Sequence, residues 1–324
     1  MIFNKYNFMI RLKDDAQLPF YKGSTFRGVM GHALKKVVCA LKNQECQSCV
    51  LRSNCTYAMV FETAHAIELP KGLRISSAPH PLVLEPPETS QRDFLKGETL
   101  TCTLLFFGQI NNNLPYFIYA FDQMGKIGIG KKIDGRRSRF VLESVTAGDD
   151  GSVVYTHDDQ KIKISETSSM MIYSELEADN CLPISTKSHK GHERVTMNII
   201  TPLRIIARNA PVARLPFHLL ISSIIRRNTA LFNVYGEGEP KLDYPAMVEA
   251  AKSIEVTENS LKWLDWKRYS SRQDKKMFMG GLTGSITYQG DLAQFLPMMT
   301  MAETVHVGKN SAFGLGKITF RNDS

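Results

Sequence analysis

The chain has 324 residues, of which 43% are hydrophobic and 22% are charged, a balance typical of a soluble globular protein large enough for two domains. Its 40 lysines and arginines outnumber 32 acidic residues, which gives a net charge of +8. This excess favours a polyanionic partner such as a nucleic acid, although a mildly basic protein without one is the alternative. Residues 1–15 lack the apolar core of a targeting signal, and no run approaches a membrane span, so we expect a cytoplasmic protein with no membrane partner.

The first half of the chain alternates between strand-like and helix-like patterns. Residues 1–15 alternate as a strand, and we expect a helix after Gly23, with Ser24 as its N-cap. Apolar residues recur through that helix at helical spacing: Phe26, Val29, Met30, Ala33, Leu34, Val37, Val38 and Leu41. Residues 70–87 are proline-rich and we interpret them as irregular. Further along, the patterns predict a strand at 100–107, a helix at 114–124, a glycine-rich loop at 125–130 and a strand at 140–145.

The second half repeats this plan. Residues 194–204 have a strand pattern, a helix is expected from Pro216, and a shorter helix at 244–254. The patterns then predict β-rich runs at 261–269 and 277–288, a helix at 291–300, a second glycine-rich loop at 308–317 and a closing strand.

The two glycine-rich loops lie in matching contexts, each after a β-rich run and a helix. This self-similarity predicts an internal duplication and an α+β fold of two tandem ferredoxin-like domains, each a β-α-β-β-α-β unit. We assign residues 1–165 to the first domain, with a cysteine-rich insertion at 39–57, and residues 166–192 to a linker. Residues 193–324 form the second domain, with its glycine-rich loop at 307–317.

Four of the six cysteines are clustered with the spacing C-x6-C-x2-C-x5-C: Cys39, Cys46, Cys49 and Cys55. In a cytosolic chain this grouping predicts a metal site, and four thiolates suit a structural zinc ion. An iron–sulfur cluster is the alternative metal centre, and four buried free thiols are the alternative without metal. Four thiolates leave no open coordination position, so the site would be structural. Cys102 and Cys181 are interpreted as ordinary apolar residues.

The glycine pairs Gly128/Gly130 and Gly314/Gly316, each followed by a lysine, suit either of two roles. Such a loop can present amide hydrogens and positive charge to phosphate, or it can be a tight turn before a strand. Neither copy matches the dinucleotide fingerprint, because its third glycine is replaced by Ile133 in one and Thr319 in the other.

Several of these motifs together resemble a known family. Residues 307–317 are similar to the glycine-rich loop of CRISPR-associated RAMP proteins, and residues 201–204, 226–227, 268–270 and 280–284 resemble the C-terminal half of endoribonucleases that process precursor CRISPR RNA. Residues 26–32 and the cysteine cluster, ending at 55–62, resemble the N-terminal half of a cysteine-bearing branch of that family.

The resemblance implies RNA bound in a basic cleft between the domains and cleavage of CRISPR repeat RNA without a metal or other cofactor. In such a reaction the ribose 2′-hydroxyl attacks the adjacent phosphorus, which leaves a 2′,3′-cyclic phosphate and a 5′-hydroxyl. A non-catalytic RAMP subunit that binds CRISPR RNA in an effector complex is the alternative, since a shared fold does not secure activity. The implied partners are CRISPR repeat RNA, mature CRISPR RNA and subunits of such a complex.

Histidine suits the proton transfers of this reaction because its unperturbed pKa lies near neutrality. His32 occupies a position that looks like the family's first-helix histidine and shares a helical face with Lys36, which suits charge stabilisation. Tyr21 is the candidate assisting residue; a solvated helix histidine is the alternative for His32. His306, His65 and His80 are weaker candidates. The predicted RNA-binding residues are Lys131, Lys132, Arg136, Arg137, Arg204, Arg226, Arg227, Arg268, Lys309, Gly314, Gly316 and Lys317.

Overall fold

The computed structural model describes residues 1–42, 44–73, 75–148, 151–163, 193–270 and 275–323. Contacts divide the chain into two compact units: Met1–Met171 with Asn233–Glu237, and Ile172–Phe232 with Gly238–Ser324. We call them unit 1 and unit 2. The predicted linker at 166–192 lies outside the described residues, so the predicted domain boundaries stay predictions. In the part of the chain that the structure describes, no helix has the length and apolar character needed to cross a membrane.

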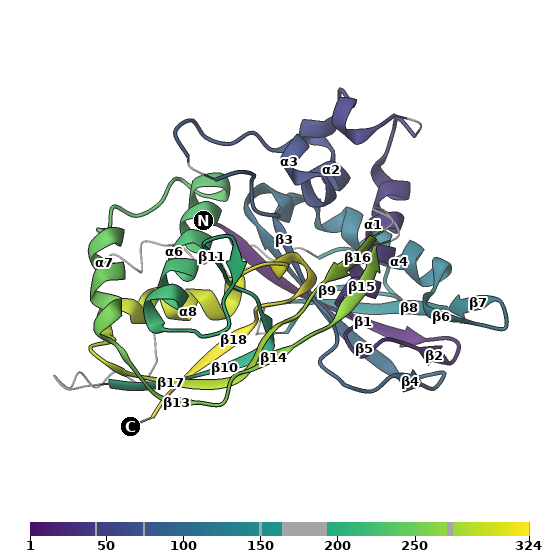
Figure 1. Ribbon diagram of the computed structural model, residues 1–324. Coiled ribbons are helices and arrows are strands. Elements are labelled where there is room, and N and C mark those ends of the chain that lie inside the picture. The colour runs from purple at the N-terminus through teal and green to yellow at the C-terminus, as the bar shows by residue number, and fades with distance from the viewer. Residues whose placement is uncertain (43, 74, 149–150, 164–192, 271–274, 324) are drawn as a thin grey trace. The chain divides into compact units, whose positions relative to one another are not determined.

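Unit 1 has the β-α-β-β-α-β order of a ferredoxin-like domain (Figure 1). Its main elements are β1 (Phe3–Leu12), α1 (Gly23–Val38), β3 (Leu82–Glu85), β5 (Thr99–Phe107), α4 (Leu114–Ile127), β8 (Phe140–Ala147) and β9 (Ser152–Thr156). The sheet order is β3-β5-β1-β8-β9, and every neighbouring pair is antiparallel. The sheet and the two helices share one core, in which Phe8 of β1 stacks on Phe121 of α4 with ring centroids 4.4 Å apart.

Shorter elements connect this frame. They are β2 (Ala16–Gln17), η1 (Cys46–Ser48), η2 (Arg52–Asn54), α2 (Thr56–Phe61), α3 (Thr63–Ala66), β4 (Asp93–Phe94), η3 (Gly108–Asn113), β6 (Ile129–Ile133) and β7 (Arg136–Ser138). The predicted glycine-rich loop at 125–130 is therefore the end of α4 followed by the start of a β6–β7 hairpin.

Unit 2 repeats the same topology. Its main elements are β10 (Glu193–Leu203), α6 (Phe217–Tyr235, of which the residues from Asn233 on belong to unit 1), α7 (Tyr244–Ala250), β13 (Glu255–Asn259), β17 (Gly281–Gly290), α8 (Leu296–Val305) and β18 (Ile318–Asn322). The sheet order β13-β17-β10-β18 matches β3-β5-β1-β8 of unit 1, again with antiparallel neighbours. The predicted duplication is thus present in the strand order, and the prediction of two tandem ferredoxin-like domains is confirmed.

The smaller elements of unit 2 are β11 (Ile206–Ala207), β12 (Ala210–Pro211), η4 (Ala251–Ser253), β14 (Lys262–Leu264), β15 (Lys267–Ser270), β16 (Lys275–Phe278), η5 (Ala293–Phe295) and η6 (Ser311–Phe313). The two predicted β-rich runs are each broken into two strands. Two glycines lie at the second break, where neighbouring backbone leaves no room for a side chain: a Cβ at Gly280 would lie 2.4 Å from the Leu264 carbonyl oxygen and one at Gly281 would lie 2.7 Å from that of Leu203.

One local prediction in unit 1 is wrong. Lys22, not Ser24, occupies the N-cap position of α1, and no side chain caps the helix. The Ser24 hydroxyl is buried without a hydrogen-bond partner. The helix starts two residues earlier in the chain than a Ser24 cap requires, because Gly23 already has helical conformation.

Candidate functional site

The exposed side of α1 carries the predicted catalytic pair. Phe26, Met30, Ala33 and Leu34 are buried in the unit 1 core, while Gly28, His32 and Lys36 are exposed at intervals of four residues. Residues four apart lie on one helical face, so these three form a continuous solvent-facing ridge. We call it the α1 ridge. It places the His32 imidazole and the Lys36 ammonium on the same surface, as the periodicity predicted.

Tyr21 lies just before α1 and is half-buried. Burial raises the pKa of its hydroxyl far above the usual value, and the charges of Glu85 and Cys102 raise it further. The hydroxyl therefore stays protonated at neutral pH. A hydroxyl with so high a pKa is a poor general base.

The remaining histidine candidates differ in their access to a ligand. His306 is fully buried beneath the terminal loop, and its Nδ1 lies 3.1 Å from the Leu315 carbonyl oxygen. His306 could face RNA or pack beneath the terminal loop by its position in the sequence, and the structure shows the packing. His80 Nδ1 lies 2.7 Å from the Thr63 hydroxyl, whereas His65 on α3 is exposed.

The segment that follows the cysteines docks on α1 through rings and cations. The Phe61 ring lies under the Arg27 guanidinium, with Cζ 4.5 Å from the ring centroid, and stacks on Tyr57 at 5.2 Å. The Lys35 ammonium lies 5.4 Å from the Tyr57 centroid. Arg27 also donates to the Val60 carbonyl at 3.0 Å, so α2 is fastened to the helix that carries His32.

The four clustered cysteines are half-buried free thiols. Burial raises the pKa of Cys46, Lys35 opposes this, and Glu62, Cys55 and Cys39 add to it. These thiols thus lie within electrostatic range of one another. Among the described residues, however, no group of three or more histidine, cysteine or acidic side chains is placed to hold a metal ion. The metal site stays a prediction, and Cys181 lies outside the described residues.

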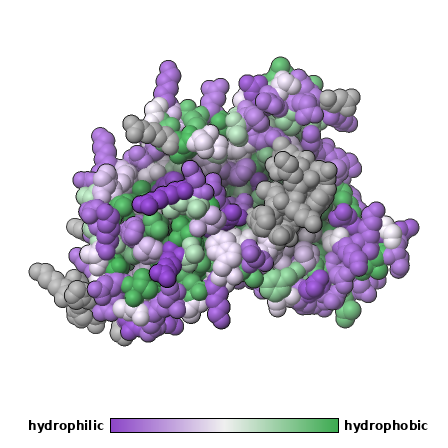
Figure 2. Space-filling model, viewed as in Figure 1, coloured by the Kyte–Doolittle hydropathy of each residue, from purple (hydrophilic) through white to green (hydrophobic). Residues whose placement is uncertain are grey.

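Four predicted RNA-binding cations lie on the β6–β7 hairpin, which we call the basic hairpin. Lys131, Lys132, Arg136 and Arg137 are all exposed there, against one carboxylate, Asp134. Figure 2 shows this hairpin as a hydrophilic projection of unit 1. Gly128 and Gly130, at the start of the hairpin, have structural roles.

Gly128 ends α4 with φ 82°, a conformation in which a side chain is strained. A Cβ at Gly130 would lie 2.5 Å from the Gln17 carbonyl oxygen. The first glycine pair therefore ends a helix and lets the hairpin pack against β2, as the tight-turn interpretation expected.

The terminal loop of unit 2 is closed by its own hydrogen bonds. The amides of Lys309, Gly316 and Lys317 donate to the Arg204 carbonyl, the Pro202 carbonyl and the Thr201 hydroxyl, at 2.8, 3.1 and 2.9 Å. The Gly314 amide donates to the Ser311 carbonyl at 2.7 Å. These four amides are thus engaged within unit 2 and do not form a phosphate cradle in this arrangement.

Gly316 and Gly314 are buried with φ of 73° and 82°, and a Cβ at Gly316 would lie 1.8 Å from the Val307 carbonyl oxygen. Both glycines therefore shape the loop. Of the two lysines in this loop, Lys309 is exposed and Lys317 half-buried.

The remaining predicted cations of unit 2 have different environments. Arg227 donates to the Val305 and His306 carbonyls at 3.0–3.2 Å, which satisfies the C-terminus of α8 and gives this residue a structural role. Arg226 is exposed and Arg204 half-buried. The backbone of Arg268 lies on β15, but its side chain is outside the described part of the chain.

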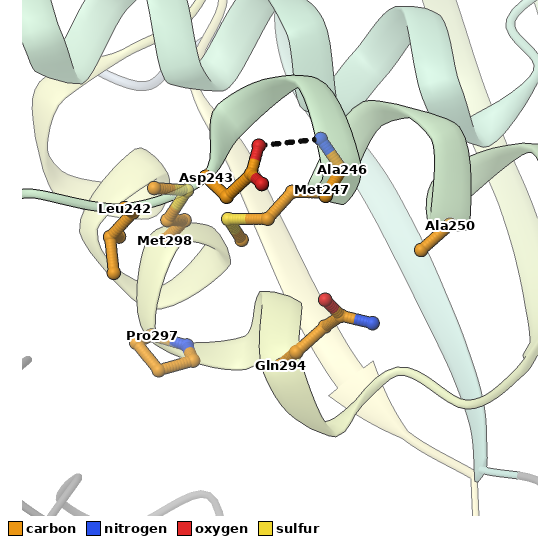
Figure 3. Close-up of a pocket in the computed structure, with 8 residues that line it drawn as sticks. All are labelled: Leu242, Asp243, Ala246, Met247, Ala250, Gln294, Pro297 and Met298. Carbon is orange, nitrogen blue, oxygen red and sulfur yellow. Dashed lines mark hydrogen bonds between the residues drawn. The ribbon is translucent and has the colours of Figure 1, made fainter.

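Unit 2 also contains an open apolar pocket of about 470 Å³ between α7 and α8 (Figure 3). Leu242, Met247, Pro297 and Met298 supply most of its wall. The Asp243 carboxylate at its rim accepts a hydrogen bond from the Ala246 amide at 3.0 Å and so caps α7. None of the predicted site residues lines this pocket, and its lining offers no cation for a phosphate.

Two ferredoxin-like units in tandem, the second closed by a glycine-rich loop, define the fold class of this chain. Residues 1–167, more than half of the chain, match the family model AF_1859_N, described as an N-terminal domain. Residues 197–318 match the model of the CRISPR-associated endoribonuclease Cas6. The chain therefore belongs to the AF_1859_N family and carries a Cas6-type C-terminal domain. The predicted resemblance to Cas6-type CRISPR proteins is confirmed, whereas the assignment to a cysteine-bearing branch stays a prediction.

Individual proteins are similar to this chain in sequence or in fold. An uncharacterized protein of Archaeoglobus fulgidus is 26% identical over 311 residues, covering 94% of this chain and 93% of that protein. Thermus thermophilus Cas6 superposes with a TM-score of 0.56 at 14% identity, covering 99% of this chain and 98% of the other. A partial Cas6-RT-Cas1–Cas2 complex gives a TM-score of 0.57 at 14% identity, and this chain spans 46% of that longer chain. At these identities the solved structures establish the fold.

Proposed function

We propose that this protein is an endoribonuclease that cuts CRISPR repeat RNA in precursor CRISPR RNA. The match of residues 197–318 to the Cas6 endoribonuclease model carries the proposal. The exposed α1 ridge and the basic hairpin support it, because they offer a proton-transfer group and phosphate-binding charge on the surface of unit 1. The proposed partners are CRISPR repeat RNA, its processed product and, as in the solved Cas6-RT-Cas1–Cas2 assembly, other CRISPR proteins.

In the proposed reaction His32 removes the proton from the ribose 2′-hydroxyl as that oxygen attacks the adjacent phosphorus. The bond from phosphorus to the 5′-oxygen breaks, and that oxygen takes a proton to become a 5′-hydroxyl. The other product ends in a 2′,3′-cyclic phosphate. Lys36 stabilises the charge on the phosphate oxygens, and the protonated Tyr21 hydroxyl donates a hydrogen bond to them. No metal ion takes part in these steps.

A matched pair of histidine variants tests this proposal. His32→Ala should slow single-turnover cleavage of repeat RNA by roughly 10²–10⁴-fold, the usual contribution of general acid–base catalysis, with little change in RNA affinity. His157 is an exposed histidine of the same unit, after β9, and His157→Ala should leave the rate unchanged. Equal rates for the two variants would remove His32 from the mechanism.

Substrate chemistry tests the nucleophile and the absence of a metal. Wild-type protein should cut repeat RNA in excess EDTA, and the upstream product should carry a cyclic phosphate. A single deoxyribose before the scissile phosphate should abolish cutting at that position. If the protein binds repeat RNA tightly but never cuts it, the non-catalytic RAMP subunit is the correct assignment.

We further propose that the cysteine cluster binds one structural zinc ion. The sequence spacing and the effect of Cys39 and Cys55 on the pKa of Cys46 support this, and an iron–sulfur cluster is the alternative. Closure of four thiolates on a metal would stabilise the segment that leads into α2. Elemental analysis of protein purified without added metal should find about one zinc per chain, lost in a Cys46→Ser, Cys49→Ser variant. The same metal content in both proteins would disprove the site.

A further inference from the structure

Two tyrosines on the outer side of α4 are unusually exposed. Tyr116 is 48% and Tyr119 is 54% exposed, whereas their neighbours Phe117 and Phe121 are fully buried in the unit 1 core. The tyrosines are three positions apart in the sequence, so their rings lie about one helical turn apart on one face. Among the described residues of unit 1, Phe20 is the other large aromatic side chain with such exposure.

The same helical face leads into positive charge. Lys126, in the last turn of α4, is exposed and pairs with Asp122 at 2.7 Å. The hydrogen bond to Asp122 is the main cause of the raised Lys126 pKa, and the charges of Asp122 and Tyr119 add to it. The Tyr119 hydroxyl therefore lies within electrostatic range of Lys126. We call Tyr116, Tyr119 and Lys126 the α4 stripe.

The basic hairpin begins immediately after this stripe. Gly128 ends α4 and β6 starts at Ile129, so the four exposed hairpin cations follow within a few residues of Lys126. The Arg137 guanidinium donates one hydrogen bond to the Gly130 carbonyl at 3.4 Å, and the Asp134 carboxylate offsets one positive charge. The hairpin still carries four cations against one carboxylate. Exposed rings next to a cationic strip are the composition of a single-strand binding surface.

No described aromatic residue of the unit 1 sheet is among the exposed large hydrophobic side chains. On the side of the sheet away from α1 and α4, the Thr103 hydroxyl donates to Asn7 at 2.8 Å, and Arg11 pairs with Glu143. Two aromatic residues on that side, Phe3 and Phe107, are buried. Base stacking on the strands, as in many RNA-binding domains of this topology, is therefore not available at these positions.

We propose that the α4 stripe and the basic hairpin form a second RNA-binding site, in which Tyr116 and Tyr119 stack on bases of unpaired RNA while Lys126 and the hairpin cations bind its phosphates. Every base has a π-face, so the site tolerates any sequence and holds single-stranded RNA outside the cleaved segment. The inference rests on the proposed function only in that the natural ligand is RNA. A protein partner is disfavoured, because the adjoining charge is mostly positive, against Asp122 and Asp134, and matches phosphate.

Oligouridine without any CRISPR repeat sequence is the probe, with binding followed by fluorescence anisotropy. Tyr116→Ala and Tyr119→Ala should each weaken binding about fivefold or more, the loss expected for one stacked base. Tyr116→Phe and Tyr119→Phe keep the ring and should bind within about twofold of wild type. Val153→Ala removes an apolar side chain that is 53% exposed on β9 of the same unit, and it should have no effect.

Salt dependence separates the two halves of the site. Lys131→Ala, Arg136→Ala protein should show a flatter salt dependence, by about 0.7 of a slope unit per lost phosphate contact, whereas the tyrosine variants should keep the wild-type slope. Urea unfolding curves identify any variant that is not folded. Folded Tyr→Ala variants with wild-type affinity would overturn the proposal, as would Tyr→Phe variants that bind as weakly as Tyr→Ala.

Cleavage of repeat RNA is measured on the same proteins and separates this inference from the proposed function. The single-turnover rate at saturating protein should be unchanged in the tyrosine variants, because the α1 ridge is intact. Wild-type protein that cannot cut repeat RNA, but loses oligouridine binding on tyrosine replacement, would refute the nuclease and support the second site. Wild-type cleavage together with unchanged oligouridine binding in the tyrosine variants would support the nuclease and refute the second site.

Discussion

Two glycines three residues apart in α1 predict opposite effects of the same substitution. Gly28 lies on the α1 ridge, and an added Cβ would meet nothing within 4 Å. Gly31 lies on the buried side, where an added Cβ would be 2.7 Å from Cε1 and 2.9 Å from Cζ of Phe61. We therefore expect Gly28→Ala to stabilise the protein and Gly31→Ala to destabilise it relative to Gly28→Ala.

The expected difference in stability between the two variants follows from two contributions. Replacing a glycine inside a helix by alanine gains about 0.5–1 kcal/mol, because alanine loses less backbone entropy on folding. This gain is common to both variants and cancels in their difference. Phe61 cannot swing away freely, since Arg27 covers one side of its ring at 4.5 Å and Tyr57 stacks on it at 5.2 Å. Overpacking of this kind costs about 1–3 kcal/mol, which is the expected difference between the two variants.

Urea unfolding followed by circular dichroism measures both free energies. Gly28→Ala should raise the free energy of unfolding by about 0.5–1 kcal/mol, with Gly31→Ala about 1–3 kcal/mol below it. Phe61→Leu in the Gly31→Ala background should recover most of the loss, since it removes the ring edge that the methyl meets. The reasoning is refuted if Gly31→Ala is as stable as Gly28→Ala, or if the Phe61 change gives no recovery.

Two further substitutions test local structure. Gly316→Ala should destabilise the protein by about 1–3 kcal/mol more than Gly135→Ala, measured by thermal or urea unfolding. Both glycines have positive φ, but only at Gly316 would the added Cβ meet a backbone oxygen, that of Val307. Equal losses of stability in the two variants would contradict the closed loop. Hydrogen bonds from Arg139 lower the pKa of Asp14 from 3.8 to about 2. The ionised Asp14 therefore stabilises the folded state at any pH above the pKa that Asp14 has in the unfolded chain. This contribution is lost as the pH falls from about 4 to about 2. Asp14→Asn should lower the free energy of unfolding by under about 1 kcal/mol at neutral pH, since the Asp14–Arg139 pair is exposed, and should not lower it at about pH 2. A loss of stability that does not depend on pH would disprove the pairing.

Helices and strands with a strong periodicity of apolar residues could be predicted from the sequence. The α1 face was predictable from apolar residues at helical spacing, and β1 from its alternation. In both units the strand that was missed is the second of the ferredoxin-like order. β3 is four residues long and lies in a proline-rich stretch, and all five residues of β13 are exposed. Edge strands of this kind show no apolar alternation, so only pairing with β5 and β17 reveals them.

The candidate site divides in the same way. The shared exposure of His32 and Lys36 follows from local periodicity and was predicted. The engagement of the loop amides depends on partners more than 100 residues away in the chain, such as Thr201 and Pro202, which no local pattern encodes. The exposed pair Tyr116 and Tyr119 had a signal that was overlooked, namely two aromatic residues on the polar side of an amphipathic helix.

The two glycine pairs show how a duplicated fold acquires different surfaces. In unit 1, Gly128 ends α4 and a hairpin with four exposed cations is inserted before β8. In unit 2 the corresponding connection from α8 to β18 is a closed loop whose amides bind neighbouring carbonyls. A loop that satisfies its own donors is rigid but offers few groups to a ligand, whereas a projecting hairpin offers many. Phosphate binding at these equivalent positions should therefore be stronger in unit 1, so charge removal at the hairpin should weaken RNA affinity more than Lys309→Ala does.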